Sequence, residues 1–265
     1  MPSFPKSIGL FIICRTHSKR FPNKIKKKIL SKSILEILLI RLIEKFPRSN
    51  IVICTSIKNK DNFFLNILKK YKIKLFFGND QNLFKRYLNC MNKFSFNHFV
   101  RITGDNPFTD LEAINKIAIK HLKMKSNYTF TRGLIRGTRP EIFSKKILLK
   151  YIKLAENPLS SEYLTFYFHR EFKFQHCVRF KKIFLNQEKL SISIDSPKNL
   201  KNIKKIFLSE SDFLLNRKKL YKKIKSYSRY FKKKLLIRIP LKTKRYNTRL
   251  KTDPKKLKYI KVNFN

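Results

Sequence analysis

Glycine, tryptophan and acidic side chains are scarce in this chain of 265 residues. It has 5 glycines, no tryptophan, and 16 aspartates and glutamates against 63 lysines and arginines. The formal net charge of +47 at pH 7 means that a compact fold must tolerate strong self-repulsion or bind anions. The composition therefore favours nucleic acid, phosphate esters and anionic membranes as partners.

Long apolar segments and closely spaced cysteines are absent as well. No stretch reaches the ~18 uninterrupted apolar residues of a membrane-spanning helix. Arg15 directly follows the apolar run 8–14, where a signal peptide would need a small-residue cleavage site. The 4 cysteines lie far apart and without C-x-x-C spacing. We therefore expect a reduced protein in the cytoplasm.

The basic residues are unevenly distributed along the chain. Residues 216–265 contain 20 lysines and arginines and one acid, Asp253. In the rest of the chain the excess is more evenly spread, as in an ordinary solvated surface. We expect a nucleotide-binding domain over residues 1–210 and a basic, partly helical extension over residues 211–265. The charge of that extension suits weak electrostatic contact with nucleic acid or anionic membrane.

Short apolar runs alternate with segments of helical period in the first half of the chain. Strands are predicted for residues 8–14, 51–55, 73–77, 98–103, 128–132, 141–143, 172–180 and 190–194. Helices are predicted for residues 33–46, 59–71, 81–94, 110–122, 145–155, 161–169, 197–208 and part of 214–227. This alternation is typical of an α/β fold in which helices cover a mostly parallel sheet.

Polar residues follow three of these strands, at the end where open α/β sheets bind their ligands. The loop 15–24 contains four cations and two hydroxyl groups, which together with backbone amides can cradle a triphosphate. Asp105 follows the strand 98–103, and Asp195 follows the run 190–194. Carboxylates beside a phosphate cradle are natural Mg²⁺ ligands. Two of them in one cleft suit metal-assisted nucleotidyl transfer.

Simpler interpretations of the same residues stay open at this point. A lysine-rich loop can be merely solvated, and Asp110 is expected to cap the helix that follows it. Asp105 can form an Asx turn, and Asp195, which precedes Ser196 and Pro197, can cap a helix.

Two motifs resemble those of a known family. Residues 12–24, Ile-Ile-Cys-Arg-Thr-His-Ser-Lys-Arg-Phe-Pro-Asn-Lys, resemble the signature A-R-x-x-S-x-R-L-P-x-K of the cytidylyltransferases that make CMP-activated sugar acids. Residues 101–107, Arg-Ile-Thr-Gly-Asp-Asn-Pro, resemble the motif R-I-T-G-D-x-P of the branch called spore coat polysaccharide biosynthesis protein F. Further matches follow in order at residues 86–87, 137–143, 161–165 and 194–197.

The resemblance implies a three-layer, Rossmann-like nucleotide-diphospho-sugar transferase fold. It also implies an enzyme that uses Mg²⁺ to transfer CMP from CTP to a sugar acid, with release of pyrophosphate, in surface polysaccharide or glycan biosynthesis. Because relatives are often dimers, it implies a homodimer too. The catalytic residues that it implies are Arg15, Arg20 and Lys24. The residues implied to contact nucleotide or substrate are Ser18, Arg86, Arg101, Thr103 and Glu141, and those implied to bind metal are Asp105 and Asp195.

The chain departs from the family pattern at two places. The family usually has glycines in the first loop where this chain has Thr16-His17 and Asn23, although asparagine can still adopt the left-handed conformation. On the sugar side, the branch reads G-L-D-V-E where residues 137–141 read Gly-Thr-Arg-Pro-Glu, so Arg139 replaces an acid and the acceptor is left open. The alternative function is a non-catalytic nucleic-acid-binding protein that uses the basic surface and tail.

Overall fold

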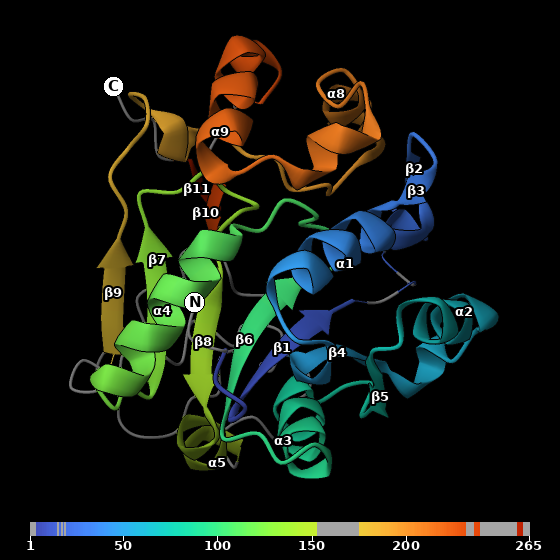
Figure 1. Ribbon diagram of the computed structural model, residues 1–265, viewed down its shortest axis with the longest axis vertical. Coiled ribbons are helices and arrows are strands. Elements are labelled where there is room, and N and C mark those ends of the chain that lie inside the picture. The colour runs from blue at the N-terminus through green and yellow to red at the C-terminus, as the bar shows by residue number, and fades with distance from the viewer. Residues whose placement is uncertain are drawn as a thin grey trace.

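A computed structural model describes residues 4–14, 16, 18, 20–152 and 175–231, together with the backbone of two short strands, β10 (Leu236–Arg238) and β11 (Tyr259–Lys261). Its centre is a seven-stranded sheet with the order β5-β4-β1-β6-β8-β7-β9 (Figure 1). The strands are β1 (Ile8–Ile13), β4 (Ile51–Ser56), β5 (Lys74–Gly78), β6 (His98–Thr103), β7 (Tyr128–Arg132), β8 (Glu141–Ser144) and β9 (Gln175–Arg179). Every neighbouring pair in this sheet is parallel except those of β8, which is antiparallel to β6 and β7.

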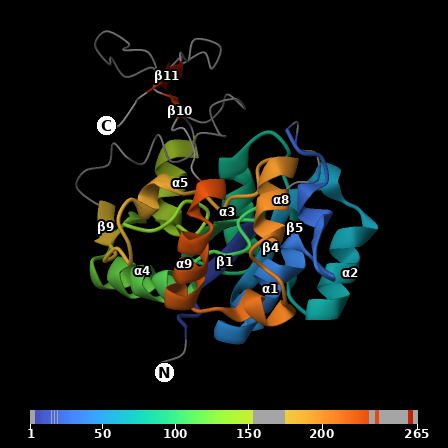
Figure 2. The same cartoon turned by 90° about the horizontal axis from the view of Figure 1, so that it is seen from above.

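Helices cover both faces of this sheet (Figures 1 and 2). One face carries α1 (Ile34–Lys45), α2 (Asn62–Tyr71) and α4 (Leu111–Lys123), and the other carries α3 (Leu83–Lys93) and α5 (Lys145–Ile152). Alternate residues of one strand serve the two faces: Val100 of β6 joins the first core and Phe99 the second. The predicted three-layer α/β architecture with a mostly parallel sheet is confirmed.

Helix boundaries follow local capping signals in the sequence. Ser33 and Glu36 form a capping box at the start of α1, in which the Ser33 hydroxyl accepts from the Glu36 amide (3.2 Å) and Glu36 accepts from the Ser33 amide (2.9 Å). The carboxylate of Asp110 accepts from the Ala113 amide (2.9 Å), so the predicted cap of α4 is confirmed. Because these signals are local, the sequence predicts both helix starts closely.

One predicted strand is wrong. Leu190 and Ser191 are isolated bridge residues, Ser191 with Arg136, and among the described residues the segment 190–194 forms no strand ladder. The amide of Ser191 donates to the carbonyl of Phe231 (3.1 Å), and the amide of Ile194 donates to that of Asp105 (3.0 Å). The segment is extended, but its backbone hydrogen bonds go to separate parts of the fold.

The remaining differences are small. The hairpin of β2 (Lys28–Ile29) and β3 (Lys32–Ser33) was not predicted, and its turn places Leu30 at a φ of 53°. Helix α8 (Pro197–Lys204) is shorter than the predicted 197–208. The helix predicted over 161–169 lies outside the described residues.

A third cluster of buried residues lies beyond the carboxyl ends of the strands, beneath α8 and α9 (Arg217–Ser226) in Figure 1. Phe108 stacks on Phe207 with ring centroids 4.0 Å apart. Tyr221 of α9 is fully buried, and its hydroxyl donates to or accepts from the Thr138 hydroxyl (2.7 Å) and accepts from the Ile135 amide (3.0 Å). The beginning of the predicted extension, up to Phe231, thus packs on the domain.

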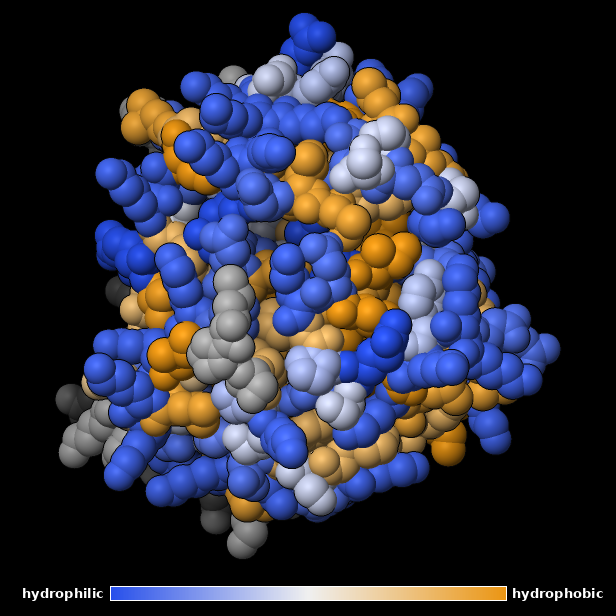
Figure 3. All heavy atoms as spheres, in the orientation of Figure 1, coloured by the Kyte–Doolittle hydropathy of each residue, from blue (hydrophilic) through white to orange (hydrophobic). Residues whose placement is uncertain are grey.

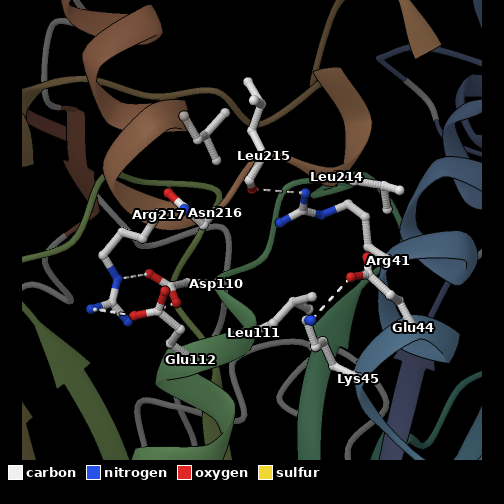
Figure 4. A pocket seen from close by; sticks show the side chains of 11 residues that line it. Arg41, Glu44, Lys45, Asp110, Leu111, Glu112, Leu214, Leu215, Asn216 and Arg217 are labelled. Atoms are coloured by element: carbon white, nitrogen blue, oxygen red, sulfur yellow. Dashed lines mark hydrogen bonds and ion pairs between the residues drawn. The ribbon is translucent and has the colours of Figure 1, made fainter. Parts of the chain in front are cut away.

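Two arginines also attach this segment to the domain, around a pocket of about 130 Å³ (Figure 4). Arg41 of α1 is buried and donates to the carbonyls of Phe213 and Leu215, the latter at 3.4 Å. Burial lowers the pKa of its guanidinium to about 10. Arg217 of α9 forms an ion pair with Asp110.

In the described part of the chain, no helix has the length and apolar character needed to cross a membrane.

Candidate active site

Three of the predicted charged residues meet at the carboxyl end of the sheet. The ammonium group of Lys24 forms an ion pair with Asp105, and its Nζ lies 3.8 Å from Oδ1 of Asp195. The Lys24 side chain is 12% exposed, and those of Asp105 and Asp195 are 17% and 21% exposed, so the group is partly shielded from water. One cation therefore lies between two carboxylates that come from distant parts of the sequence.

The backbone brings the two carboxylates together. Asp105 follows β6 and Asp195 follows the extended segment 190–194, and the two meet through the hydrogen bond from the Ile194 amide to the Asp105 carbonyl. Next to Asp105, the Gly104 amide donates to the Ile13 carbonyl (2.9 Å). A Cβ on Gly104 would lie 2.7 Å from the Cβ of Cys14, so this glycine permits the close approach of β1 and β6.

Backbone hydrogen bonds to Thr16 hold the first loop together. The amides of Ser18 (3.0 Å) and Asn23 (2.9 Å) both donate to the carbonyl of Thr16. Asn23 has φ 53° and ψ 23°, so the expectation that it can adopt the left-handed conformation in place of glycine is confirmed. Arg20 is largely exposed, and its guanidinium lies 3.4 Å from Asp195. Arg15 lies outside the described residues.

In the described part of the chain, none of the hydrogen bonds of Arg86 goes to Lys24, Asp105 or Asp195. Its buried guanidinium donates from Nε to the Asn79 carbonyl (2.7 Å) and from Nη2 to the Asp80 carbonyl (2.9 Å). It thereby fixes the loop that follows β5. Contact with a nucleotide stays a prediction for this residue.

Arg101 and Glu141 form a second polar group on the sheet. They lie opposite each other in the β6–β8 register, with Arg101 Nη1 3.0 Å from Glu141 Oε2. Burial alone would lower the pKa of Arg101, but Glu141 reverses this and the pKa is raised. The Tyr128 hydroxyl donates to Glu141 (3.0 Å), a contact that the sequence analysis missed because Tyr128 begins a strand that carries no recognised motif.

Two further residues of the sequence analysis have defined contacts. The Thr103 hydroxyl, at the end of β6, accepts from the Asn106 side chain (2.5 Å). Arg139, at the position where the related branch has an acid, donates from Nε to the Leu134 carbonyl (2.7 Å). Burial and the neighbouring Arg136 lower the pKa of Arg139.

The chemistry of this region is electrostatic. Burial raises the pKa of the Cys14 thiol well above its ordinary value, so this cysteine at the end of β1 stays protonated and is a poor nucleophile. Within the described ranges, no three His, Cys, Asp or Glu side chains gather in a way that could hold a metal ion. Lys24, Arg20, Asp105 and Asp195 therefore offer two cations for phosphate and two carboxylates for a cation.

The sequence profile described as cytidylyltransferase matches residues 10–230 of the chain. The chain belongs to the cytidylyltransferase family. The match includes all four residues of the charged group and extends through α9. Members of this family are enzymes that transfer a cytidylyl group, so the predicted enzyme class and family are confirmed.

Relatives of this cytidylyltransferase include an uncharacterised protein of Methanocaldococcus jannaschii, 33% identical over 74% of this chain and 81% of its own length. The spore coat polysaccharide biosynthesis protein SpsF of Bacillus subtilis is 28% identical over 60% of this chain and 68% of its own length. The resemblance to that branch, inferred from the motifs, is thus confirmed.

Solved structures of low sequence identity share the fold. A cytidylyltransferase from Leptospira borgpetersenii superposes with a TM-score of 0.77 at 23% identity and covers 87% of this chain and 99% of its own. A CMP:2-keto-3-deoxy-manno-octonic acid synthetase complexed with CTP has a TM-score of 0.59 at 11% identity and covers 76% of this chain and 98% of its own.

Proposed function

We propose that this cytidylyltransferase transfers CMP from CTP to a sugar acid, with Mg²⁺ as cofactor and release of pyrophosphate. The observation that carries the proposal is the position of Lys24 between Asp105 and Asp195, with Arg20 beside them. A triphosphate is a dense anion, and its transfer depends mainly on positioning and on electrostatic stabilisation. Cations and carboxylates at one sheet edge suit that task.

The carboxylate pair fits Mg²⁺. The Lys24 ammonium lies between Asp105 and Asp195. The two carboxylates therefore already attract a positive charge to the space between them. Mg²⁺ prefers one or two carboxylates and completes its shell with water and phosphate oxygens. Asp105 and Asp195 would hold the ion. When bound, the ion would neutralise the negative charge that develops on the phosphates.

The residues of the chain would act as follows. Lys24 and Arg20, with Arg15 and Ser18 of the same loop, bind phosphate oxygens and hold the α-phosphate in place. A hydroxyl oxygen of the acceptor forms a bond to the α-phosphorus. The bond from the α-phosphorus to the pyrophosphate oxygen, on the opposite side, breaks at the same time. The hydroxyl proton passes to water. Because Cys14 is protonated and buried, we assign no covalent enzyme intermediate to the reaction.

The acceptor and the pathway are supported by the relatives. SpsF is named for polysaccharide biosynthesis, and the synthetase complexed with CTP is named for a sugar acid. We therefore propose a role in surface polysaccharide or glycan biosynthesis, with CTP and a sugar acid as substrates. The cytoplasmic location is carried over from the sequence analysis. A homodimer is part of the same proposal, carried over from the family resemblance.

Thermal unfolding with CTP, ATP, GTP or UTP, each with and without Mg²⁺ and at raised salt, tests the nucleotide. A ligand at a hundred times its dissociation constant stabilises a protein by about 2.7 kcal/mol. We expect the melting temperature to rise with CTP and Mg²⁺ only. A panel of sugar acids, with pyrophosphate release as the measured quantity, then identifies the acceptor.

Matched variants test the site. Asp105→Asn keeps the size of the side chain and removes its charge, and it is expected to abolish the dependence of CTP binding on Mg²⁺. Asp61→Asn serves as the control, because it removes the same charge from a carboxylate that pairs with Lys26 and lies outside the charged group. The control should keep the Mg²⁺ dependence of CTP binding. Equal stabilisation by all four nucleotides, or unchanged Mg²⁺ dependence in Asp105→Asn, would contradict the proposal.

The charge of residues 216–265, 20 basic residues against one acid, favours a second role for this chain. We propose that the extension contributes weak contact with nucleic acid or with anionic membrane. Binding to nucleic acid should weaken by about 0.7 to 0.9 log units per log unit of salt for each phosphate neutralised. A shallow salt dependence, together with unchanged partition to acidic vesicles after deletion of residues 232–265, would remove this role.

A further inference from the structure

Two arginines of the loop between β7 and β8 lie beyond the carboxyl end of the sheet, the end that carries the charged group. Arg136 and Arg139 are both partly buried, and neither forms an ion pair among the residues that the structure describes. Burial lowers the pKa of both guanidinium groups, and Arg136 lowers the pKa of Arg139 further. The acid that acts on Arg139, Glu188, is paired with Lys182 at 3.1 Å. Two neighbouring cations without a carboxylate attract an anion.

The backbone holds Arg136 against the extended segment that leads to Asp195. The Arg136 amide donates to the Leu190 carbonyl (3.1 Å), and the Ile192 amide donates to the Arg136 carbonyl (2.9 Å). These two hydrogen bonds pair Arg136 with Ser191 as neighbours in a parallel sheet are paired. The arginine is therefore fixed to the same segment that supplies one carboxylate of the charged group.

The side chains of this segment alternate between two sides. Those on one side are buried in the cluster beneath α8 and α9, namely Leu190, Ile192 and Ile194. Those on the other side are partly exposed, namely Ser191, Ser193 and Asp195. Paired residues of parallel strands share a side, so Arg136 lies with Ser191 on the side of Asp195.

The spacing along this side suits a sugar. Side chains on one side of an extended chain repeat about every 6.8 Å, so Asp195 follows Ser191 at about 14 Å. The arginine side chain beside Ser191 reaches over part of this distance, and the remainder is on the scale of one sugar ring. Ser191 and Ser193 carry hydroxyl groups along the way, which suit hydrogen bonds to a sugar.

We propose that Arg136 and Arg139 bind an anionic group, a carboxylate or a phosphate, at the end of the acceptor sugar remote from the hydroxyl that receives CMP. The inference rests on the proposed function, which places the reacting hydroxyl beside Lys24, Asp105 and Asp195. A guanidinium group binds either anion through paired hydrogen bonds. The related branch has an acid where this chain has Arg139, and an acid would repel such a group. The arginines thus select the acceptor.

Arginine labelling with phenylglyoxal, measured by peptide mass spectrometry on the full chain, tests this subsite. The probes are glucuronate and glucose 6-phosphate, whose carboxylate or phosphate lies at the end of the ring away from the anomeric hydroxyl. Glucose is the neutral control. We expect one or both anionic probes to slow the labelling of Arg136 and Arg139, with and without CTP and Mg²⁺, and glucose to leave it unchanged. The stronger of the two anionic probes identifies the group as a carboxylate or a phosphate.

Variants separate the subsite from the general basicity of the surface. Hydrophilic residues cover most of the face seen in Figure 3, and the net charge is +47, so any anion is attracted to some extent. Arg136→Gln and Arg139→Gln should each weaken binding of the protecting probe about tenfold, as for the loss of one hydrogen bond to a charged group. Arg48→Gln removes the same charge from an exposed position directly before β4, at the opposite end of the sheet, and should leave this affinity unchanged.

Arg136→Gln is the decisive variant. Arg139→Gln also loses the hydrogen bond to the Leu134 carbonyl, whereas the Arg136 side chain makes no hydrogen bond in the described part of the chain. Wild-type affinity in Arg136→Gln, or an equal loss of affinity in Arg48→Gln, would overturn the proposal.

The labelling results can overturn it as well. Absence of protection by both anionic probes, equal protection by glucose, or equal protection of Arg48 would each contradict an anion subsite at these two arginines. Because the protection is measured without nucleotide too, it does not depend on CTP binding. A wild-type protein that fails to respond to CTP and Mg²⁺ would contradict the proposed function instead, so the two failures are distinguishable.

Discussion

Lys24 sets the charge balance of the candidate active site, because its one ammonium faces two carboxylates in a region that is only partly open to water. Arg20 adds a second cation from the exposed side. Sequence reasoning selected all four charged residues of this group, since the scarce acids and the family motifs both pointed to them. It could not foresee that Arg86 is occupied by the carbonyls of Asn79 and Asp80, because those contacts depend on the path of a loop.

Lys24→Met tests the role of this ammonium. Methionine is similar in length and lacks the charge, so the carboxylates would repel each other and the triphosphate would lose a contact. We expect turnover to fall by about a hundredfold or more, in the range seen when one preorganised electrostatic donor is removed. Pyrophosphate release measures this loss, and circular dichroism checks that the fold is kept. Near-normal turnover would show that Lys24 is only structural.

His121 is a residue whose burial has a measurable pH effect. It is fully buried and bonded to Thr129 (2.9 Å) and His98 (3.0 Å), and burial with the neighbouring histidines lowers its pKa to about 3. The unfolded chain binds this proton near pH 6.5, whereas the folded chain does not. The free energy of unfolding is therefore expected to fall as the pH drops below 6.5, by at most about 1.4 kcal/mol per pH unit from this group.

Urea unfolding of the wild type and of His121→Asn between pH 7 and pH 5 measures that effect. The variant is expected to be less stable at pH 7, since it loses buried contacts, and to show a flatter dependence on pH. Parallel curves for the two proteins would mean that His121 does not titrate differently in the folded state.

At the scale of elements, capping and periodicity decided most of what the sequence predicted. Strands β6 and β7 have the predicted bounds, and α1 and α4 start after their capping residues. The run 190–194 alternates like a strand, yet its amides pair with Asp105 and Phe231 of separate segments. No local pattern distinguishes a strand from an extended segment whose partners are loops, because the pairing is decided by contacts far away in the sequence.

Glu36→Gln tests the cap of α1. Burial would raise the pKa of Glu36, but hydrogen bonds from Lys70 and Ser33 outweigh it and lower the pKa to about 2. A folded pKa below the unfolded value of 4.5 stabilises the fold above that pH, and the effect is lost as the pH falls toward 2. We expect the variant to lose about 1 kcal/mol of unfolding free energy at pH 7.

Urea unfolding of wild type and Glu36→Gln, at pH 7 and then at decreasing pH, checks this expectation. The difference between the two proteins should shrink below about pH 4.5, as the carboxyl of the unfolded chain becomes protonated. Lys45→Gln is a suitable control, since Lys45 lies at the other end of α1 and pairs with Glu44. A difference that is constant with pH would assign the loss to packing.

At the scale of the whole molecule, the first part of the basic extension is joined to the nucleotide-binding domain. Arg41 holds the carbonyls of Phe213 and Leu215, and Arg217 pairs with Asp110 at the start of α4. Residues that bury their side chains beyond position 210 are Phe213, Leu220, Tyr221, Ile224 and Phe231. The division of the chain at 210 was drawn from charge density, which does not report what these apolar residues contact.

Two truncations test how far the folded unit extends. The burial of five such side chains contributes about 2 kcal/mol each, or about 10 kcal/mol together, which equals the whole net stability of a typical domain. A chain ending at 210 is therefore expected to aggregate or remain unfolded. A chain ending at 231 should melt within a few degrees of the full chain and keep its response to CTP. Cooperative folding of the shorter chain would contradict this account.

The sequence by itself determined the α/β alternation, the helix caps, the enzyme family and the charged residues of the candidate site, because each depends on local spacing or on a short motif. Only the tertiary structure decided two other features. It placed Lys24 between Asp105 and Asp195, and it engaged Arg101 with Glu141. These depend on which strands and segments become neighbours, and such long-range contacts leave no periodic trace in the chain.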